Sequence, residues 1–390
     1  MTRTVQSKLK RQRAKRQAMF LVFGCAGVIG LVLLVFTLTS PRYASEGNYS
    51  EAQTAGEVTT PLEEVPEVTE GAGAPSLSMG IGGDVTFGLA VADVIEREGA
   101  AYPWAAVAPL FEDYDVTVAN LEGPFCRGSE PNPDQPSIYL RGDASYAAPM
   151  ADAGIDAVCL ANDHIMDYGT AGLEETLNTL RAEEIGVFGA GSNKRAADQP
   201  LLIESANGAS VALLSFCDVA PPAYVAGDDS PGVSRASLDG IREIVGTAAG
   251  EAPYVVVFVH WGDVGSADIT SRQREIAQAC VDAGADLVVG SHPHVVQGIE
   301  VISGVPIIYS LGNLVFSSES EAGKNAVFAG CSFSGDRLTR LDLIPLRVEG
   351  ARPTPLAGEQ AESVLRQLEA TSPGVGLEIS PLTGTATLRL

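Results

Sequence analysis

Histidine is rare in this chain of 390 residues, which contains only four. Basic residues are also scarce beyond the first seventeen positions, which hold seven of the 25. The other 18 basic residues are outnumbered by 49 acidic ones, a balance of −31. So acidic a body repels polyanions at long range, which argues against a nucleic-acid partner and suits cation binding better.

Closely spaced cysteine pairs are absent. The chain has six cysteines but no Cys-x-x-Cys motif, so neither a zinc ribbon nor a redox pair is indicated. A disulfide from Cys126 or Cys331 remains open. Packed thiols are expected where the sequence context is apolar, at Cys159, Cys217 and Cys280.

The only long hydrophobic run lies near the N-terminus. Twenty residues from Met19 carry no charge, which at 1.5 Å per residue matches the ~30 Å of a bilayer core. A basic cluster precedes the run, so we predict a cytoplasmic tail (1–18) and a single-pass membrane anchor (19–39), with the remainder outside the cell. A cleavable signal peptide is the alternative. Residues 40–75, rich in glutamate and proline, are expected to be a disordered acidic linker.

The rest of the chain alternates short apolar runs with helical patterns. Helices are expected at 173–185 and 274–284. Strands are expected at 76–85, 116–122, 156–163, 211–216, 254–262, 285–294 and 305–316. The alternation predicts an α/β domain over 76–350, with a mostly parallel sheet covered on both faces, and a C-terminal extension (351–390) packed on it.

Polar residues follow five of the expected strands. In parallel sheets, ligands bind beyond the carboxyl ends of the strands. We therefore predict a single polar site at one sheet edge that contains all four histidines. Its candidate residues are Asp84, Glu122, Asn162, His164, His260, His292 and His294.

The strongest single motif is His292-Pro293-His294. Such a pair can place two imidazoles on one ion or on two adjacent ions, at Zn–N distances of about 2.0–2.1 Å. His260 ends an apolar strand, where a lone histidine is usually a satisfied core residue. The three residues together favour a metal site.

A second motif runs from Asn162 to Gly169. Asn162 can ligate a metal through its amide oxygen, and His164 can give a proton to a leaving group. Asp167 either orients His164 or caps the following helix.

Four further residues are less specific. Asp84 and Glu122 offer the hard oxygen ligands that divalent metals accept, but each also fits an ordinary polar strand end or turn. Asn120 shares a strand face with Glu122, and Asn313 follows another strand at the same edge. We assign both asparagines to substrate contacts, with an ordinary turn residue as the alternative for Asn313.

Six segments taken together, GGDV, NLEGP, ANDHIMDYG, HWG, GSHPHVVQG and YSLGNLVF, give a more specific signal. Over about residues 76–320 the chain resembles the CapA family of poly-γ-glutamate capsule biosynthesis proteins, a branch of the calcineurin-like metallophosphoesterase superfamily. The resemblance implies a sheet sandwich flanked by helices and a site for two divalent ions, with Mn, Fe or Zn plausible. It implies ligand roles for Asp84, Glu122, Asn162, His260, His292 and His294, and a general-acid role for His164.

Three residues depart from the patterns that the resemblance implies. Thr86 stands where the superfamily usually has a histidine ligand, and Glu122 where it has a bridging aspartate. Asp163 stands where the CapA family more often has asparagine. One half of the expected site is therefore a ligand short.

These features support three hypotheses. The first is a membrane-anchored, extracytoplasmic protein of capsule or poly-γ-glutamate biosynthesis with a metal-dependent hydrolase-type site. The second is a non-catalytic scaffold or polymer-binding subunit of a membrane synthase, which the absent ligand at Thr86 favours. The third is a general metal-dependent phosphoesterase, which the remaining ligands favour. The expected partners are the membrane and a cell-surface polymer or the subunits of its synthase.

Overall fold

The computed structural model describes residues 76–133 and 138–390. The predicted tail (1–18), anchor (19–39) and linker (40–75) lie outside the described residues. Within the described part, no helix combines the length and the apolar character that a membrane crossing requires.

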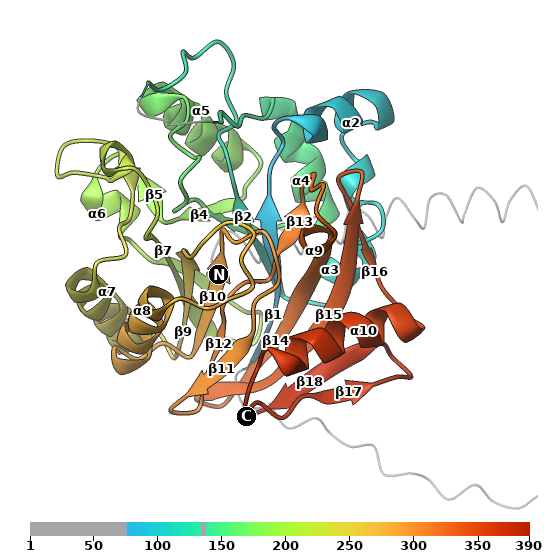
Figure 1. The fold of residues 1–390 in the computed structure, drawn as a ribbon. Helices are drawn as coiled ribbons and strands as arrows, with labels where there is room; N and C mark the ends of the chain where they lie inside the picture. Colours follow the sequence, from blue (N-terminus) through green and yellow to red (C-terminus); the bar gives the residue numbers. More distant parts are fainter. Residues whose placement is uncertain (1–75, 134–137) are drawn as a thin grey trace, which may run out of the picture. The chain divides into compact units, whose positions relative to one another are not determined.

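Two large β-sheets form the centre of the fold (Figure 1). The larger has ten strands in the order β17-β18-β15-β14-β1-β2-β3-β4, with β13 on β1 and β16 on β15. Its strands are β1 (Ser76–Val85), β2 (Val116–Leu121), β3 (Ala157–Cys159), β4 (Gly186–Phe188), β13 (Asn313–Val315), β14 (Asn325–Ser334), β15 (Arg337–Glu349), β16 (Arg352–Pro355), β17 (Glu378–Ser380) and β18 (Thr385–Arg389).

The smaller sheet has six strands in the order β11-β12-β10-β9-β7-β6. These are β6 (Leu201–Glu204), β7 (Ser210–Cys217), β9 (Tyr254–His260), β10 (Leu287–Ser291), β11 (Ile299–Ile302) and β12 (Val305–Ile308). A two-stranded ribbon of β5 (Ala190–Gly191) and β8 (Gly232–Val233) completes the strands.

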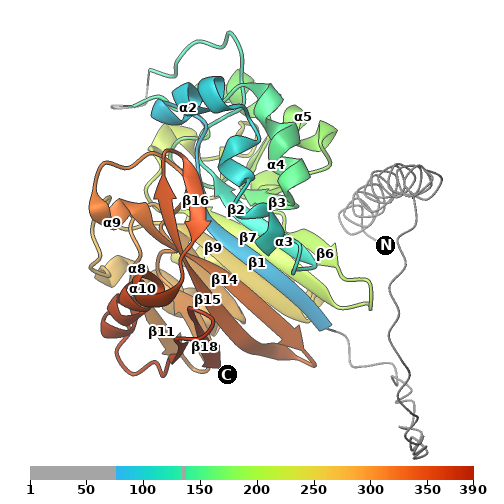
Figure 2. The same ribbon diagram turned by 90° about the vertical axis from the view of Figure 1, so that its right-hand side faces the viewer.

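Helices flank both sheets, with α2 to α5 packed against the larger one and α7 and α8 against the smaller one (Figures 1 and 2). They are α2 (Ala90–Glu98), α3 (Ala108–Phe111), α4 (Ala147–Ala153), α5 (Gly169–Ala182), α6 (Lys194–Ala197), α7 (Leu238–Glu251), α8 (Ser271–Asp282), α9 (Glu321–Lys324) and α10 (Gly358–Ala370). Three short 3-10 helices are η1 (Tyr102–Trp104), η2 (Ala144–Tyr146) and η3 (Pro222–Tyr224). The two helices expected at 173–185 and 274–284 are present as α5 and α8.

Strand β9 shows how the layers pack, because all seven of its residues are buried. Val255, Val257 and Val259 join one core cluster with α7 and α8. Tyr254 and Phe258 point the other way, and their rings meet Phe333 and Phe188 of the larger sheet at centroid distances of 5.0 and 5.3 Å. Alternate side chains of a strand face opposite sides, so β9 needs apolar residues throughout. The predicted α/β sandwich flanked by helices is confirmed.

The expectation of a mostly parallel sheet is only partly correct. Pairing is parallel from β1 to β4 and among β7, β9, β10 and β12. It is antiparallel where β14, β15, β16, β17 and β18 meet. Only Gly335 and Asp336 separate β14 from β15, and a two-residue connection permits only an antiparallel hairpin.

Residues 351–390, predicted as a packed extension, contribute strands to this sheet. Both β16 and β18 pair with β15, and α10 lies between them in the chain. The five cysteines of the described part are all buried and free. The expected packed thiols are therefore confirmed, and neither Cys126 nor Cys331 forms a disulfide.

Gly83 lies where β1 approaches the segment that leads into β13. Strand β1 runs through Gly82-Gly83 to Val85, as expected, with a shift in register against β2 between Ile81 and Asp84. A Cβ atom at Gly83 would lie 1.8 Å from the carbonyl oxygen of Gly312. That neighbour is backbone and cannot swing aside, so only glycine lets the segment leading into β13 lie beside Asp84.

We expect Gly83→Ala to lower the free energy of unfolding by about 2–3 kcal/mol, because the added methyl group forces backbone atoms apart. Chemical denaturation of the full-length protein measures the change. Gly250→Ala is the matched control, since Gly250 lies in α7 and a Cβ there meets nothing within 4 Å. Its expected effect is neutral or slightly stabilising. Equal effects of the two variants would contradict the proposed close approach.

Candidate metal centre

The residues proposed for the site converge at the carboxyl ends of strands from both sheets. Asp84 is the penultimate residue of β1, Glu122 follows β2, and the Asn162–His164 segment follows β3 in the larger sheet. His260 ends β9, while His292 and His294 follow β10 in the smaller sheet. The prediction that all four histidines share one region is confirmed by the contacts described below.

One triad consists of Asp84, Glu122 and His294. The two ring nitrogens of His294 lie 3.2 Å from Asp84 Oδ2 and 3.4 Å from Glu122 Oε1. Burial disfavours the charged forms here, but the neighbouring charges prevail. They raise the pKa of His294 well above its usual value, and His294, His260 and Asn120 lower the pKa of Asp84.

Glu122 indicates most directly that the first triad suits a cation. The residue is 1% exposed, and its Oε2 is buried without a hydrogen-bond partner among the described residues. An unpaired buried carboxylate oxygen is costly, whereas a divalent cation takes such an oxygen as a ligand. The donor set of two carboxylates and one imidazole therefore fits a divalent metal.

A second triad consists of Asp163, His260 and His292. His260 Nε2 lies 2.8 Å from Asp163 Oδ1 and 3.1 Å from His292 Nδ1. The other ring nitrogen of His260 contacts the Ser291 hydroxyl at 2.8 Å, which fixes the ring. Burial works to raise the pKa of Asp163, but hydrogen bonds from both histidines hold it well below its usual value. Three ligand atoms thus face one small region, as a metal ion requires.

Asp163 is a site residue that sequence reasoning missed. The ligand role assigned to Asn162 from the sequence stays a prediction. In the structure its amide oxygen accepts hydrogen bonds from the backbone N–H groups of His164 and Ile165. Its amide nitrogen donates to Asn120 Oδ1 and to the carbonyl of Leu121. Asn162 thus shapes the loop, and the next residue presents its carboxylate to the histidines. The available signal was an acidic residue immediately before His164.

A third group links the two triads. Ligand atoms of Glu122, Asp163 and His164 lie within 4.8 Å of one another. Glu122 belongs to the first triad and Asp163 to the second, so the triads are neighbours. This spacing supports the predicted arrangement of two adjacent cation positions.

His164 is held by Asp167. The His164 Nδ1 lies 2.8 Å from Asp167 Oδ2, which also accepts a hydrogen bond from the backbone N–H of Leu140. Burial works to lower the pKa of His164, but Asp167 and Asp163 outweigh it and raise the pKa to about 9. Of the two roles considered for Asp167, the geometry favours orienting His164, because its carboxylate is engaged there and α5 has no side-chain cap.

The two asparagines predicted to contact substrate are buried and hydrogen-bonded to other residues of the site. Asn120 Nδ2 donates to Asp84 Oδ1 at 2.8 Å. Asn313 contacts His294 through both amide atoms, at 3.1 Å to Nδ1 and 3.1 Å to the carbonyl oxygen. Both therefore position side chains of the first triad. The hydroxyl of Thr86 accepts a hydrogen bond from Gly88 N–H instead of joining the cluster.

The backbone of the His292–His294 loop is strained. Both histidines have positive φ angles, 93° and 56°, which non-glycine residues rarely adopt. Such strain persists only where surrounding contacts hold it, and it concentrates at functional sites. Here the contacts are those of His292 with His260 and of His294 with Asp84, Glu122 and Asn313.

We expect Asp163→Ala to reduce the metal bound per chain, because it removes the carboxylate facing His260 and His292. Asn162→Ala should instead lower the free energy of unfolding by about 2–4 kcal/mol, since four buried hydrogen bonds worth about 1 kcal/mol each are lost. Elemental analysis and chemical denaturation measure the two effects. A loss of metal from Asn162→Ala alone would return the ligand role to Asn162.

Comparisons with a family model and with curated proteins relate this chain to bacterial proteins of capsule synthesis. Residues 78–318 match the family model described as bacterial capsule synthesis protein PGA_cap. The PGA biosynthesis protein CapA of Bacillus subtilis is 30% identical, over 76% of this chain and 78% of the relative. The capsule biosynthesis protein CapA of Bacillus anthracis is also 30% identical, over 75% and 72%. A probable polyglutamine synthesis accessory protein of Mycobacterium tuberculosis is 25% identical, over 71% and 78%. The chain therefore belongs to the PGA_cap family of bacterial capsule synthesis proteins.

Proposed function

We propose that this protein acts in the biosynthesis of a capsule polymer of the poly-γ-glutamate type, through a metal-dependent hydrolase-type site. The observation that carries the proposal is the pair of adjacent triads, with the unpaired buried oxygen of Glu122 beside them. The names of the two Bacillus relatives support the polymer.

Asp84, Glu122 and His294 would hold one divalent ion, and Asp163, His260 and His292 another. Bound ions of this kind polarise an acyl or phosphoryl oxygen and lower the pKa of water. His164 lies beside both triads with a raised pKa and so carries the proton that a leaving nitrogen or oxygen needs. In the overall hydrolysis, the hydroxyl of water bonds to the acyl carbon or phosphorus as its bond to the leaving group breaks. The leaving group takes the proton of His164, and the remaining proton of the water restores the imidazolium. Asp167 keeps the imidazole protonated and oriented.

The cellular placement is part of the proposal. The uncharged run that begins at Met19, with its basic flank, supports an N-terminal anchor and an extracytoplasmic domain. That placement would hold the site beside a polymer as it leaves the membrane, in contact with the subunits of its synthase.

A non-catalytic accessory role is the second candidate. The relative from Mycobacterium tuberculosis is named as a probable accessory protein. In addition, Thr86 supplies no ligand to the first triad, which keeps only three protein side chains. In this role the same site would bind a cation and polymer carboxylates without turnover.

The deciding experiment uses the full-length protein in mild detergent. Bound metal is measured by elemental analysis, and hydrolysis is followed for poly-γ-glutamate by polymer length and for an aryl phosphodiester by colour. We expect bound divalent metal and shortening of poly-γ-glutamate. His292→Ala should lower the rate by about 100-fold or more, because removing groups behind metal ligands already costs 10–100-fold.

Arg366→Gln is the matched control, since Arg366 lies on α10 and pairs only with Glu362 and Glu369 in the described part. Metal without turnover of either substrate would favour the accessory role. Turnover of the phosphodiester alone would favour a general phosphoesterase. A rate unchanged by His292→Ala would refute the assignment of the site.

We expect Asp167→Asn to lower the rate constant by about 100-fold or more while leaving the metal content unchanged. The amide no longer stabilises the imidazolium, so the pKa of His164 falls and its orientation is lost. Measurement of kcat and of bound metal on the same preparation tests this. Loss of metal from Asp167→Asn would show that Asp167 supports the metal site and not His164 alone.

A further inference from the structure

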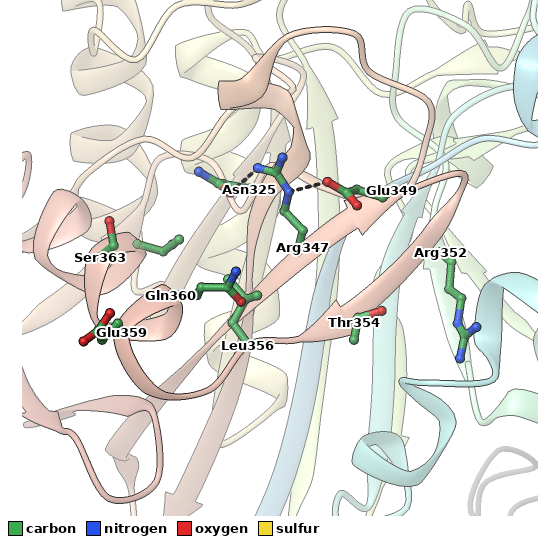
Figure 3. A pocket seen from close by; sticks show the side chains of 10 residues that line it. Asn325, Arg347, Glu349, Arg352, Thr354, Leu356, Glu359, Gln360 and Ser363 are labelled. Carbon is green, nitrogen blue, oxygen red and sulfur yellow. Dashed lines mark hydrogen bonds and ion pairs between the residues drawn. The ribbon is translucent and has the colours of Figure 1, made fainter.

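A large cavity lies where the C-terminal segment meets the larger sheet. It has a volume of about 680 Å³, within the ~300–1,000 Å³ typical of ligand sites. Figure 3 shows its side chains spread in a row from α10, past Arg347, to Arg352. The lining residues that matter here are Arg347, Arg352, Thr354, Leu356, Gln360 and Ser363.

The cavity lies at the same edge of the sheet as the metal centre. Strand β14 runs antiparallel to β1, so Asn325, its first residue, is at the end of β1 that carries Asp84. Asn325 pairs with Arg347 of β15. Neighbouring strands lie about 4.8 Å apart, so β15 is roughly 10 Å from β1 across the sheet. An extended ligand can therefore reach both places.

Further contacts connect the two places. Asn313, which holds His294, also donates a hydrogen bond to the carbonyl of Gly323, two residues before Asn325. A smaller cavity of about 60 Å³ shares Asn325 and Val364 with the large one. Its lining includes Val295 and Val296, which directly follow His294 in the chain.

Some side chains that line the cavity already have ion-pair or hydrogen-bond partners, and others have none among the described residues. Arg347 has partners, because it pairs with Glu321 and Glu349 and donates a hydrogen bond to Asn325. Arg352 lies over the ring of Tyr102 at 5.3 Å, its Nε is buried without a hydrogen-bond partner, and no carboxylate of the described part pairs with it. The side chains of Thr354, Gln360 and Ser363 are exposed and make no hydrogen bond to the described residues.

We propose that this cavity binds a segment of an extended polyamide that bears carboxylates, of the poly-γ-glutamate type. The proposal rests on the proposed function. The acidic body repels such a polymer at long range, so binding depends on local contacts. A polymer carboxylate pairs with the Arg352 guanidinium, and charge-assisted hydrogen bonds of this kind are strong. The hydroxyl and amide groups of Thr354, Gln360 and Ser363 complement the C=O and N–H groups of the polymer backbone.

The orientation follows from the charges in the row. Glu359 lies on α10 at the end away from Arg352, and it repels polymer carboxylates from that end (Figure 3). The other acidic lining residue, Glu349, is paired with Arg347. Leu356 and Val364 offer apolar contact for the methylene groups between the amides. The polymer backbone then lies along α10 with a carboxylate at Arg352, and its continuation extends toward the metal centre.

Binding is tested with full-length protein in detergent and excess chelator. The probe is an end-labelled, length-defined oligo-γ-glutamate, and fluorescence anisotropy gives its affinity. Arg352→Gln should weaken binding about tenfold. Because Arg352→Gln also removes the contact with Tyr102, a second variant, Gln360→Glu with Ser363→Glu, adds repulsion at exposed positions of α10. It should weaken binding by about the same factor.

Ala370→Glu is the matched control, because Ala370 is exposed on α10 but outside the cavity. It should leave the affinity unchanged. Equal affinity of the wild type and both cavity variants would overturn the proposal, as would the absence of binding. Equal competition by a neutral dextran of matched length would show a polysaccharide site instead. Because the chelator removes any metal, these outcomes are independent of hydrolysis, which the experiment on His292 decides.

Discussion

The structure depends on neutralising a cluster of buried carboxylates. Asp84, Glu122 and Asp167 are at most 1% exposed, and Asp163 lies close by. Burying an unpaired carboxylate costs many kcal/mol in a medium of low dielectric, so each must face a positive partner. The four histidines are the only ionisable groups of opposite sign in contact with this cluster in the described part. Protons on His164 and His294 supply part of the balance, which is why their pKa values rise.

The same balance makes protons and divalent cations competitors. A histidine that binds a metal must be neutral, so a cation that binds at His294 displaces a proton from its ring. His164 differs, because its Nδ1 is engaged by Asp167, and it can keep its proton next to an occupied centre. One electrostatic constraint therefore gives chemically similar histidines different roles. Neutral amides complete the arrangement: Asn120, Asn162 and Asn313 orient the charged groups without adding charge to the cluster.

The sequence predicted the location of the site because of a topological rule. Apolar runs ending in polar residues mark the carboxyl ends of parallel strands, and those ends meet at one edge. It could not predict which member of the Asn162-Asp163-His164 run faces the histidines, because that depends on the loop that Asn162 closes with its own hydrogen bonds. The antiparallel half of the larger sheet has two local signals and one that is not local. Two-residue connections at Gly335-Asp336 and Gly350-Ala351 require antiparallel hairpins, whereas the pairing of β15 with β18 joins segments far apart in the sequence.

Each triad draws residues from both sheets. Asp84 and Glu122 come from the larger sheet and His294 from the smaller, whereas Asp163 comes from the larger and His260 and His292 from the smaller. The site therefore exists only once the two sheets have packed against each other through contacts such as Phe188 with Phe258. A cation that binds the completed site binds the folded state alone, so its binding free energy adds to the stability of the packed sheets. Assembly of the sandwich and formation of the metal centre are then one coupled process, and the strain at His292 and His294 is sustained by the same contacts.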